Sequence, residues 1–330
     1  MDSNESAYGP SDAAREAARG AMDFVERYPD DASFTLAEAI ARRFSLDPKR
    51  ICCGFGSDDL LARPARIYLR PGDELIYPVH GYQKFPNYAH ANDAIPVAAP
   101  DRNFTADVDN IVDMLTARTR VVMLANPDNP TGTWVSGRDV RRLHRALPDD
   151  VLLVLDSAYA EYVRAETYEL PDALVEASGN VVMTRTFSKV FGLAGLRVGW
   201  MYAPEPIVDM VQRTGITFPL SAPALAGARR RWRMSITPGT WWKGTRASAL
   251  HSPTASPRSE SPCFQARPIS FSPGSPAAPT RPLNAWRWLL GAGVIARRFA
   301  AADFQDCVRF TIGTEEEMAR TAELLEAWAS

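Results

Sequence analysis

Cysteine and histidine are scarce in this sequence, and their spacing excludes two kinds of protein. The 330 residues include four cysteines and four histidines. Two of the cysteines, Cys52 and Cys53, are adjacent, so they do not make the framework of a small disulfide-stapled domain. The histidines lie far apart and show no metal-ligand spacing with the cysteines: they are His80, His90, His144 and His251. The sequence therefore predicts neither a disulfide scaffold nor a bound metal.

Long apolar runs and an excess of one charge are missing as well. No stretch approaches the roughly 20 apolar residues that a membrane helix needs, and Met1–Pro10 is polar without a signal-peptide pattern. With 37 basic and 39 acidic residues the net charge is -2, which is not the charge balance of a nucleic-acid-binding protein. We expect a cytoplasmic protein that has no membrane and no nucleic acid as a partner.

The chain does have the material for a large hydrophobic core. It is 46% hydrophobic, 10% aromatic and 23% charged, a composition that excludes a mostly disordered or fibrous protein. Its length allows about two domains or one large α/β unit.

Acidic residues are nearly absent from one segment, residues 228–285. It holds nine Pro, nine Ser, nine Lys or Arg and a single acid, Glu260. The rest of the chain carries 28 basic and 38 acidic residues, a net charge of -10. Prolines recur from Pro253 to Pro282, and helix interiors and central strands reject proline because it lacks an N–H and fixes φ. Two explanations stay open: a disordered Pro/Ser-rich linker, or a segment translated in the wrong reading frame.

Residues 34–225 alternate short apolar runs with amphipathic helical patterns, which predicts an α/β fold with a mainly parallel sheet. We expect buried strands at residues 51–53, 74–77, 121–125, 151–155 and 181–184. We expect helices at residues 35–43, from Gly56 onward, and at 136–147 with Ser136 as the N-cap. Towards the end of the chain we expect a helix at 285–291, a strand at 308–311 and a final helix from Thr314 to Trp328.

One motif has the composition of a covalent catalytic site: Thr186-Phe187-Ser188-Lys189-Val190-Phe191-Gly192, with Arg197 eight residues beyond the lysine. A lysine just past a strand end, among hydroxyls and glycines, suits a nucleophile that bonds to a carbonyl group beside a phosphate. Taken alone, the same lysine also fits an ordinary surface loop.

Two further motifs follow predicted strands, at the edge where open α/β sheets bind ligands. Asn126-Pro127-Asp128-Asn129-Pro130-Thr131-Gly132 follows residues 121–125, and Asp156-Ser157-Ala158-Tyr159 follows residues 151–155. An aspartate at the end of a buried strand needs a cationic or hydrogen-bonding partner, because an unpaired buried carboxylate is costly. A protonated pyridine nitrogen would be such a partner, and a helix N-cap is the other interpretation of Asp156.

In this order the motifs resemble the pyridoxal-phosphate aminotransferases of fold type I, and most closely the histidinol-phosphate aminotransferases. The resemblance runs from Asn4 to about Gly227 and again from about Leu289 to Trp328. It includes the segments Asn4-Glu5-Ser6-Ala7-Tyr8-Gly9-Pro10, Arg27-Tyr28-Pro29-Asp30 and Val308-Arg309-Phe310-Thr311-Ile312-Gly313. It implies a large domain with a mainly parallel sheet, a smaller α+β C-terminal domain, pyridoxal 5'-phosphate as the cofactor, and a homodimer.

The resemblance also implies the roles of residues around the cofactor ring. Lys189 would bond to the cofactor and then move a proton on the substrate, a task for which a desolvated lysine is suited. Asp156 would pair with the ring nitrogen, and Asn129 and Tyr159 would hydrogen-bond to the phenolic oxygen. Tyr82 would stack on the ring. His80 competes for that role, and a core aromatic is the other interpretation of Tyr82.

The remaining residues assigned by the resemblance bind anions. The cofactor phosphate would be held by Gly56, Ser57 and Asp58 at a helix start, by Thr186, Ser188 and Arg197, and by Tyr28 of the other subunit. Arg309 would clamp the carboxylate of glutamate or 2-oxoglutarate. Arg297 and Tyr8 would contact the substrate's distal phosphate, although Arg297 also fits a solvated surface arginine.

The implied reaction is transamination between histidinol phosphate and 2-oxoglutarate in histidine biosynthesis. Three other functions stay open: an aminotransferase for phenylalanine or another aromatic amino acid, a threonine-phosphate decarboxylase, and a catalytically impaired protein that only binds the cofactor.

Residues 228–285 depart from the family pattern, although their number is close to what the family needs. A length-preserving replacement by Arg/Pro/Ser-rich sequence is what two compensating frameshifts produce in a GC-rich gene, one near Ala228 and one near Asn284. The expected organisation is an N-terminal segment (1–29), a large cofactor-binding domain (30–227), an aberrant disordered segment (228–285) and the remnant of a small domain (286–330). On this hypothesis the small domain is disrupted, Arg297 and Arg309 lack firm support, and catalysis is impaired.

Overall fold

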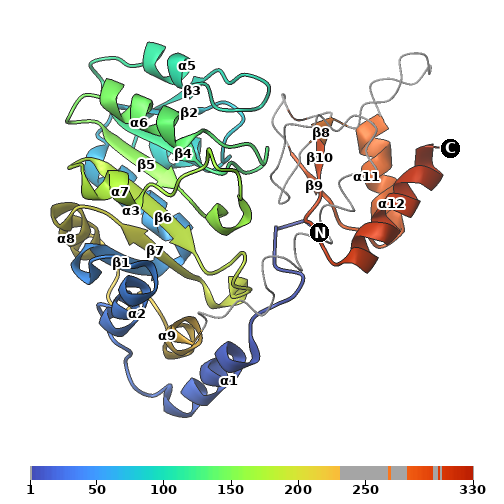
Figure 1. Cartoon of the computed structure of the whole chain (residues 1–330), viewed down its shortest axis with the longest axis horizontal. Helices are drawn as coiled ribbons and strands as arrows, with labels where there is room; N and C mark the ends of the chain where they lie inside the picture. The colour runs from blue at the N-terminus through green and yellow to red at the C-terminus, as the bar shows by residue number, and fades with distance from the viewer. Residues whose placement is uncertain (1, 231–266, 269–280, 300–303, 305–306, 330) are drawn as a thin grey trace.

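A seven-stranded sheet forms the centre of the larger part of the molecule (Figure 1). The computed structural model describes residues 2–230, 267–268, 281–299, 304 and 307–329. The strands of the large sheet are β1 (Ile51–Phe55), β2 (Glu74–Pro78), β3 (Ile95–Ala99), β4 (Thr119–Ala125), β5 (Leu152–Asp156), β6 (Val181–Thr186) and β7 (Val198–Tyr202). Their order is β1-β7-β6-β5-β4-β2-β3, and only β7 runs against its neighbours.

Helices cover both faces of this sheet. They are α2 (Phe34–Phe44), α3 (Gly56–Tyr68), α4 (Phe85–His90), α5 (Val108–Asp113), α6 (Gly137–Ala146), α7 (Asp172–Glu176), α8 (Glu205–Arg213) and α9 (Ala222–Arg229). The helix α1 (Asp12–Gly20) packs on α9. Within the described part of the chain, no helix is long and apolar enough to cross a membrane.

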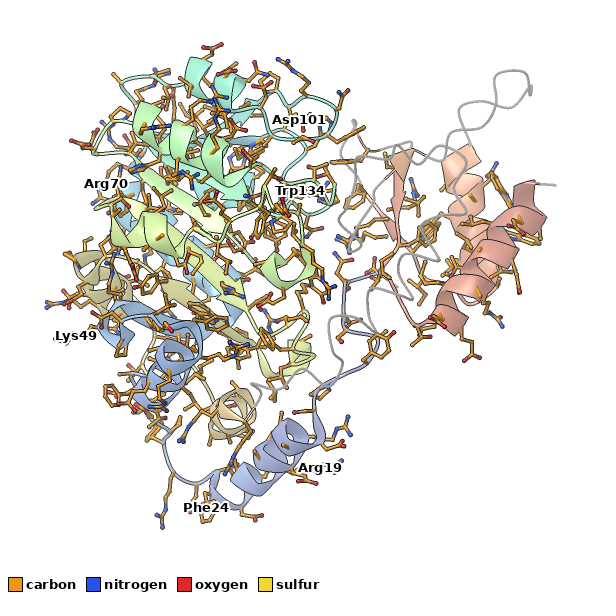
Figure 2. The ribbon with its side chains drawn as sticks, in the orientation of Figure 1. Arg19, Phe24, Lys49, Arg70, Asp101 and Trp134 are labelled. Carbon is orange, nitrogen blue, oxygen red and sulfur yellow. The ribbon has the colours of Figure 1, made fainter. Side chains whose placement is uncertain are left out.

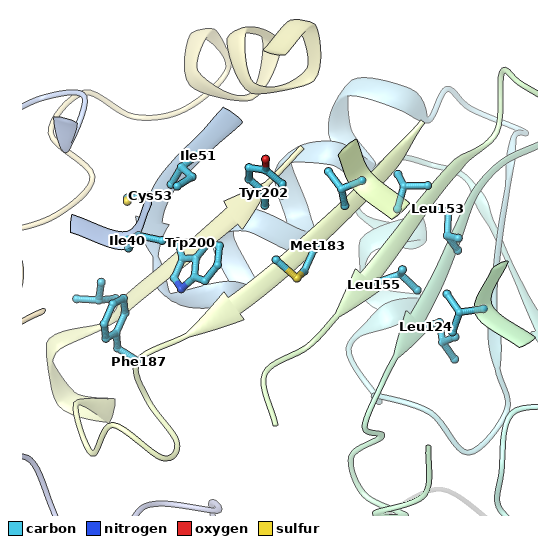
Figure 3. Packing of buried hydrophobic residues seen from close by; sticks show 14 of the residues in the cluster. Ile40, Ile51, Cys53, Leu124, Leu153, Leu155, Met183, Phe187, Trp200 and Tyr202 are labelled. Atoms are coloured by element: carbon cyan, nitrogen blue, oxygen red, sulfur yellow. The ribbon is translucent and has the colours of Figure 1, made fainter. Parts of the chain in front are cut away.

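The alternation of side chains along each strand divides the core in two. Leu153 and Leu155 of β5 point to the face that carries Trp200 of β7, α2 and α6 (Figure 3). Leu152 and Val154 point to the opposite face, under α3, α4 and α8. Each such side chain, fully buried, contributes about 1.5–3 kcal/mol relative to exposure. The sheet is therefore a rigid support for the loops at its edges.

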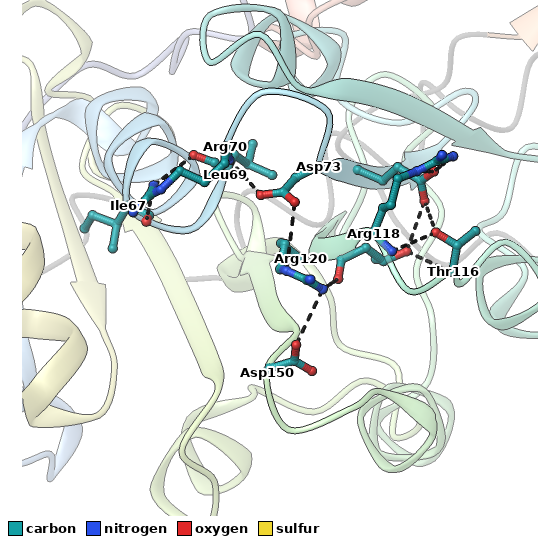
Figure 4. Close-up of polar contacts among 10 residues, drawn as sticks. Ile67, Leu69, Arg70, Asp73, Thr116, Arg118, Arg120 and Asp150 are labelled. Atoms are coloured by element: carbon teal, nitrogen blue, oxygen red, sulfur yellow. Dashed lines mark hydrogen bonds and ion pairs between the residues drawn. The ribbon is translucent and has the colours of Figure 1, made fainter.

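The two edges of the sheet carry different chemistry. At the amino ends of the strands, charged groups pair with one another: Glu74 accepts from Arg118 Nε at 2.9 Å and from Thr116 at 2.6 Å, and Arg120 pairs with Asp150 at 3.5 Å (Figure 4). The carboxyl ends lie at the other edge, towards the C-terminal part of the molecule. Parallel sheets bind ligands at the carboxyl ends, so that edge is where a site is expected.

The C-terminal part is a three-stranded antiparallel sheet with two helices. Its strands, in the order β8-β10-β9, are β8 (Arg267–Pro268), β10 (Cys307–Arg309) and β9 (Arg297–Arg298). The helices α11 (Arg281–Gly291) and α12 (Glu315–Ala329) pack together, and Trp288 Nε1 donates to the Leu324 carbonyl at 3.1 Å. In Figure 2, the labelled Asp101 and Trp134 lie on the side of the large sheet that faces this part.

Most of the segment expected to be aberrant, residues 228–285, lies outside the described residues. The structure describes the end of α9, β8 and the start of α11 within it. Arg297 and Arg309 lie opposite each other in the β9–β10 register. This placement differs from the expectation that both arginines lack support, because the strand pairing and the helices behind it hold them.

The helices and strands expected from the sequence are all present, with bounds that differ by a few residues. Ser136 caps α6 as predicted, since its Oγ accepts from the Asp139 amide at 3.1 Å. The sequence did not lead us to predict the helices α1, α4, α5, α7, α8 and α9 or the strands β3, β7, β8 and β9. The strand β3 contains Pro96 and is partly exposed, and β7 is buried but has Gly199 as its second residue, which interrupts the apolar run in its sequence.

Candidate active site

Asp156 lies at the carboxyl end of β5 and is buried, with 6% exposure. The sheet register places Thr184 of β6 beside it, and Thr184 Oγ1 donates to the carboxylate at 3.0 Å. Burial raises the pKa of Asp156 to about 7. A cation placed against this carboxylate would restore its charge, so the site has the chemistry to hold a protonated ring nitrogen.

Lys189 follows β6 and reaches the same edge of the sheet. Its Nζ donates to the Ser3 carbonyl at 3.0 Å and lies 5.5 Å from the centre of the Tyr159 ring. Burial first, and then the nearby Arg309, lower the pKa of Lys189 to about 8, whereas Asp156 opposes the shift. This amine is close to losing its proton at neutral pH, which is the state in which a lysine is a nucleophile.

The start of α3 is an anion-binding element. Gly56 has φ of +79°, and the helix has no side-chain N-cap, so its first N–H groups point out of the helix end. A Cβ at Gly56 would clash with the guanidinium of Arg197, and a Cβ at Gly199 would clash with the Gly56 backbone. Two glycines therefore allow β7 and Arg197 to approach the helix start closely.

Two hydroxyl groups from the segment around Lys189 lie with Arg197 beside the start of α3 and add polar groups for binding an anion. Thr186 Oγ1 lies 3.0 Å from Ser188 Oγ, and Arg197 Nη1 donates to the same Ser188 oxygen at 3.4 Å. Free N–H groups, the helix dipole and a guanidinium together favour a phosphate. We call the group formed by Gly56, Ser57, Asp58, Thr186, Ser188 and Arg197 the anion cup.

Tyr82 borders the anion cup, whereas His80 points elsewhere. Tyr82 Oη donates to Asp58 at 2.9 Å, and its pKa is raised by burial first and then by the charges of Asp58 and Asp156. His80 Nδ1 instead lies 2.7 Å from Asp101, and its ring is 4.8 Å from that of Phe104. Of the two candidates for a ring-stacking residue, Tyr82 is the one beside Asp58 and Asp156.

Arg309 connects the small sheet to the large one. It is 5% exposed, and its Nη1 donates to Asn129 Oδ1 at 2.5 Å in the loop after β4. Since the amide oxygen of Asn129 is engaged, its nitrogen is the group that can donate to another acceptor. Arg297 is half exposed and lies across from Arg309 in the strand register.

Tyr28 and Tyr8 were also named from the sequence, as residues that would contact phosphate groups. Tyr28 is 83% exposed and stacks on Phe218, with ring centres 4.4 Å apart. Tyr8 is half-buried in the segment between Asn4 and α1. Among the residues that the structure describes, no three acidic, histidine or cysteine side chains are grouped so as to hold a metal.

Four residues in contact with the site had no predicted role. Asn4 donates through its side chain to Tyr159 Oη at 3.4 Å and through its backbone to Thr311 Oγ1 at 2.9 Å. Thr184 contacts Asp156, and Tyr88 Oη donates to Asp58 at 2.9 Å. Asn4 and Thr311 belong to the terminal motifs already noted, which was a usable signal. Thr184 and Tyr88 carried none, because their contacts depend on strand register and helix packing.

Comparisons with known proteins agree with this geometry. Residues 1–230 match the family described as "Aminotransferase class I and II". A histidinol-phosphate aminotransferase of Granulibacter bethesdensis is 42% identical, over 99% of this chain and 88% of that protein. A histidinol-phosphate aminotransferase of Rhodopseudomonas palustris is 48% identical over 228 residues, which are 69% of this chain and 62% of that protein.

Solved structures give the same relationship. The crystal structure of histidinol-phosphate aminotransferase from Sinorhizobium meliloti in complex with pyridoxal-5'-phosphate has a TM-score of 0.87 and 26% identity. The match covers 99% of this chain and 90% of that one. The small sheet with α11 and α12 is therefore part of the same architecture, with the large sheet as its other part.

Proposed function

Because this chain belongs to the class I and II aminotransferases, we propose that it transfers an amino group between histidinol phosphate and 2-oxoglutarate, with pyridoxal phosphate as its cofactor. The single observation that carries this assignment is the 42% identity to a histidinol-phosphate aminotransferase over 99% of the chain. The convergence of Lys189, Asp156 and the anion cup at one sheet edge supports it chemically.

The side chains fit the cofactor. An uncapped helix start beside Arg197 offers donors for its phosphate, and the buried Asp156 suits its ring nitrogen. Asn129 and Tyr159 have side chains that can hydrogen-bond to its phenolic oxygen. The aromatic ring of Tyr82 can stack on the cofactor ring. When bound, pyridoxal phosphate supplies an electron sink that stabilises negative charge on the substrate carbon.

Lys189 is the group that we assign to covalent attachment and to proton transfer. Its amine, with a pKa lowered to about 8 by burial, can accept a proton from the substrate carbon and return it at neutral pH. The ammonium form donates a hydrogen bond to the neutral backbone carbonyl of Ser3. That bond can be exchanged for one to a ligand.

Arg309 and Arg297 are the groups that we assign to substrate anions. The Arg309 guanidinium is planar and buried, and it is supported by Asn129, so it suits the carboxylate of glutamate or 2-oxoglutarate. Arg297 is on the neighbouring strand and more exposed, so it suits a phosphate at the far end of the substrate, with Tyr8 as a further contact.

A homodimer in the cytoplasm belongs to the same proposal. Tyr28 and Phe218 form an exposed stack, and Ile216 nearby in sequence is 68% exposed, which suits a surface covered by a second copy of the chain. On this proposal Tyr28 contacts the phosphate bound by the other subunit. Cys52 and Cys53 are buried free thiols, a state that a reducing compartment preserves. Analytical ultracentrifugation of the chain and of a Tyr28→Ala variant tests the dimer.

The test of the proposed function uses Lys189→Ala and Arg309→Ala. Lys189→Ala should abolish the visible absorption band that pyridoxal phosphate develops with the intact chain, together with transamination of histidinol phosphate. Arg309→Ala should keep the band and raise the KM for glutamate at least tenfold. Lys49→Ala, a surface change on the far side of the large sheet (Figure 2), is the control.

Three results would contradict these assignments. Retention of the band in Lys189→Ala would remove the lysine from the reaction, and an unchanged response to glutamate in Arg309→Ala would remove the arginine from the substrate site. Higher kcat/KM for phenylalanine than for histidinol phosphate would make this an aromatic aminotransferase.

A further inference from the structure

The first residues of the chain lie across the site just described. In Figure 1 the N-terminus runs between the large sheet and the small one, beside β9. The Ser3 carbonyl accepts from Lys189 Nζ at 3.0 Å, and the Asp2 carbonyl accepts from Arg309 Nη2. The Asp2 carboxylate accepts from Arg297 Nη1 at 3.4 Å. We call residues 2–4 the N-terminal strap.

The strap is anchored at one end. Asn4 is buried, its φ is +55°, and its backbone and side chain bond to Thr311 and Tyr159. Asparagine tolerates this left-handed conformation better than most residues. Asp2 and Ser3 are more exposed than Asn4 and lie beyond this anchor, so they can move while Asn4 stays in place.

An oxygen atom of the strap accepts a hydrogen bond from each of the three cationic side chains, Lys189, Arg309 and Arg297. Lys189 and Arg309 receive neutral carbonyls, and Arg297 receives a full negative charge from Asp2. A substrate with a carboxylate at one end and a second anion at the other would pair with Arg309 and Arg297, which the strap also contacts. A small-molecule substrate and the strap therefore compete for the same groups.

We propose that the N-terminal strap and the substrate bind the same cations, and that Asp2 is a specificity-determining residue that competes with the substrate's distal anion for Arg297. This inference rests on the proposed function, because that function makes Arg297 a substrate-binding group. A ligand with a distal dianion displaces Asp2, whereas a ligand without one leaves the Asp2–Arg297 pair intact. The strap thus favours substrates that carry a distal anion over substrates that lack one, and it lowers the affinity for both.

The test compares Asp2→Asn with Asp12→Asn in the full chain loaded with pyridoxal phosphate and carrying any purification tag at its C-terminus. Asp12 is an exposed acid on α1 that pairs with Arg15, so both variants change the net charge equally. The measured quantity is the dissociation constant of inorganic phosphate, obtained by titration calorimetry. The Asp2–Arg297 pair is partly exposed, so its loss should tighten phosphate binding by about two- to fivefold. Asp12→Asn should leave phosphate binding unchanged.

A second comparison places Asp2→Asn in an Arg297→Gln background. If Asp2 acts through Arg297, the gain in phosphate affinity disappears there. Unchanged or weaker phosphate binding in Asp2→Asn overturns the proposal, since weaker binding means that Asp2 positions Arg297 for the ligand. Phosphate binding does not depend on turnover. If Asp2→Asn bound phosphate at least twofold more tightly while the chain failed to transaminate histidinol phosphate, only the proposed function would be refuted.

Discussion

At the residue scale, burial lowers the pKa of Lys189 and raises the pKa of Asp156. Lys189 becomes easier to deprotonate and Asp156 becomes easier to protonate, both mainly because of desolvation. Without the cofactor, the charged forms of Lys189 and Asp156 are therefore both disfavoured by desolvation. Lys189 would hold pyridoxal phosphate through its amine and Asp156 would pair with the cationic ring nitrogen, so cofactor affinity should depend on these two side chains.

The first prediction at this scale concerns the pH dependence of cofactor capture. The neutral amine of Lys189 is the nucleophile, and its pKa is about 8 in place of the usual 10.5. The rate of band formation after pyridoxal phosphate is mixed with the cofactor-free chain should therefore rise with pH and reach half its maximum near pH 8. Stopped-flow absorbance between pH 6 and pH 10 measures it. A midpoint near that of free lysine would show that the amine is not desolvated.

The second prediction concerns Asp156→Asn. Between about pH 4 and pH 7 the folded chain holds a proton on Asp156 that the unfolded chain has released, so this group lowers stability as pH rises through that window. Asn removes the cost, and we expect the cofactor-free variant to gain on the order of 2 kcal/mol at pH 8 and little at pH 4. The same variant should lose most of its transamination activity.

Urea unfolding of the cofactor-free chain at both pH values checks this, with Asp149→Asn as the control for an exposed acid. Equal stability of Asp156→Asn and the parent at pH 8 would show that the carboxylate is stabilised by contacts other than those seen here.

Sequence motifs located these residues correctly at the sheet edge, but they could not choose between neighbours. His80 and Tyr82 are two positions apart, and both types of ring stack on a cofactor. The choice depends on how the loop after β2 turns, since it directs His80 to Asp101 and Phe104 and Tyr82 to Asp58. Contacts of this kind are set by packing and are invisible in a single sequence.

At the element scale, the junction of α3 and β7 determines the shape of the anion cup. The sequence predicted that a helix starts at Gly56 because of the acids that follow it. It did not predict β7, whose register with β1 brings Gly199 opposite Gly54 and its backbone against Gly56. The antiparallel strand could not be inferred from an apolar run, since a glycine interrupts it and the partner strand is distant in the chain.

Gly56→Ala tests this junction. The new methyl group would meet the Arg197 guanidinium, and φ of +79° is unfavourable for alanine. We expect the dissociation constant of pyridoxal phosphate to rise at least tenfold and the free energy of unfolding to fall by about 1–3 kcal/mol. Gly20→Ala is the matched control, because nothing lies within 4 Å of its added Cβ.

Fluorescence titration with pyridoxal phosphate and urea unfolding give the two quantities. If Gly56→Ala bound the cofactor like the parent, the helix start would not be the phosphate site, whereas a loss in both variants would point to a general effect of Gly replacement.

At the scale of the whole molecule, the site exists only because the small sheet meets the large one. Arg309 of β10 reaches Asn129, and the N-terminal strap bridges Lys189 and Arg297. The resemblance assigned Arg309 and Arg297 to the substrate, but these long-range contacts were not predicted, because no local pattern contains them. What the sequence could not give is the path of the chain between α9 and β9, where the acid-poor residues lie.

The composition of that segment leads to the last prediction. The match to the aminotransferase family covers residues 1–230 and ends where acids become scarce, and the alignment with the R. palustris protein covers 228 residues, whereas the alignment with the G. bethesdensis protein spans 99% of the chain. Such a boundary is expected if the gene shifts frame near Ala228 and returns near Asn284. The genetic code makes this testable at Pro268-Ile269-Ser270-Phe271-Ser272.

Consider the frame that starts on the third base of each of these codons. Its first codon joins the third base of the Pro268 codon to the first two bases of the Ile269 codon, AT, and it encodes Asn if that third base is A. If both serines have TCN codons, the next three shifted codons end in TC, TT and TC. Each then encodes Phe, Leu, Ile or Val whatever its first base is. The shifted frame would thus contain a polar residue followed by three apolar ones, the pattern of a buried strand in the small domain.

Determining the nucleotide sequence of codons 225–292 tests this directly. We expect one alternative frame to have several acids, few prolines and the apolar strand, and a gene repaired at both points to encode a protein with higher kcat/KM for histidinol phosphate. If all three frames are equally poor in acids and rich in proline, the segment is native. Its basic, proline-rich composition would then be a property of this aminotransferase, and the repaired gene would give no gain.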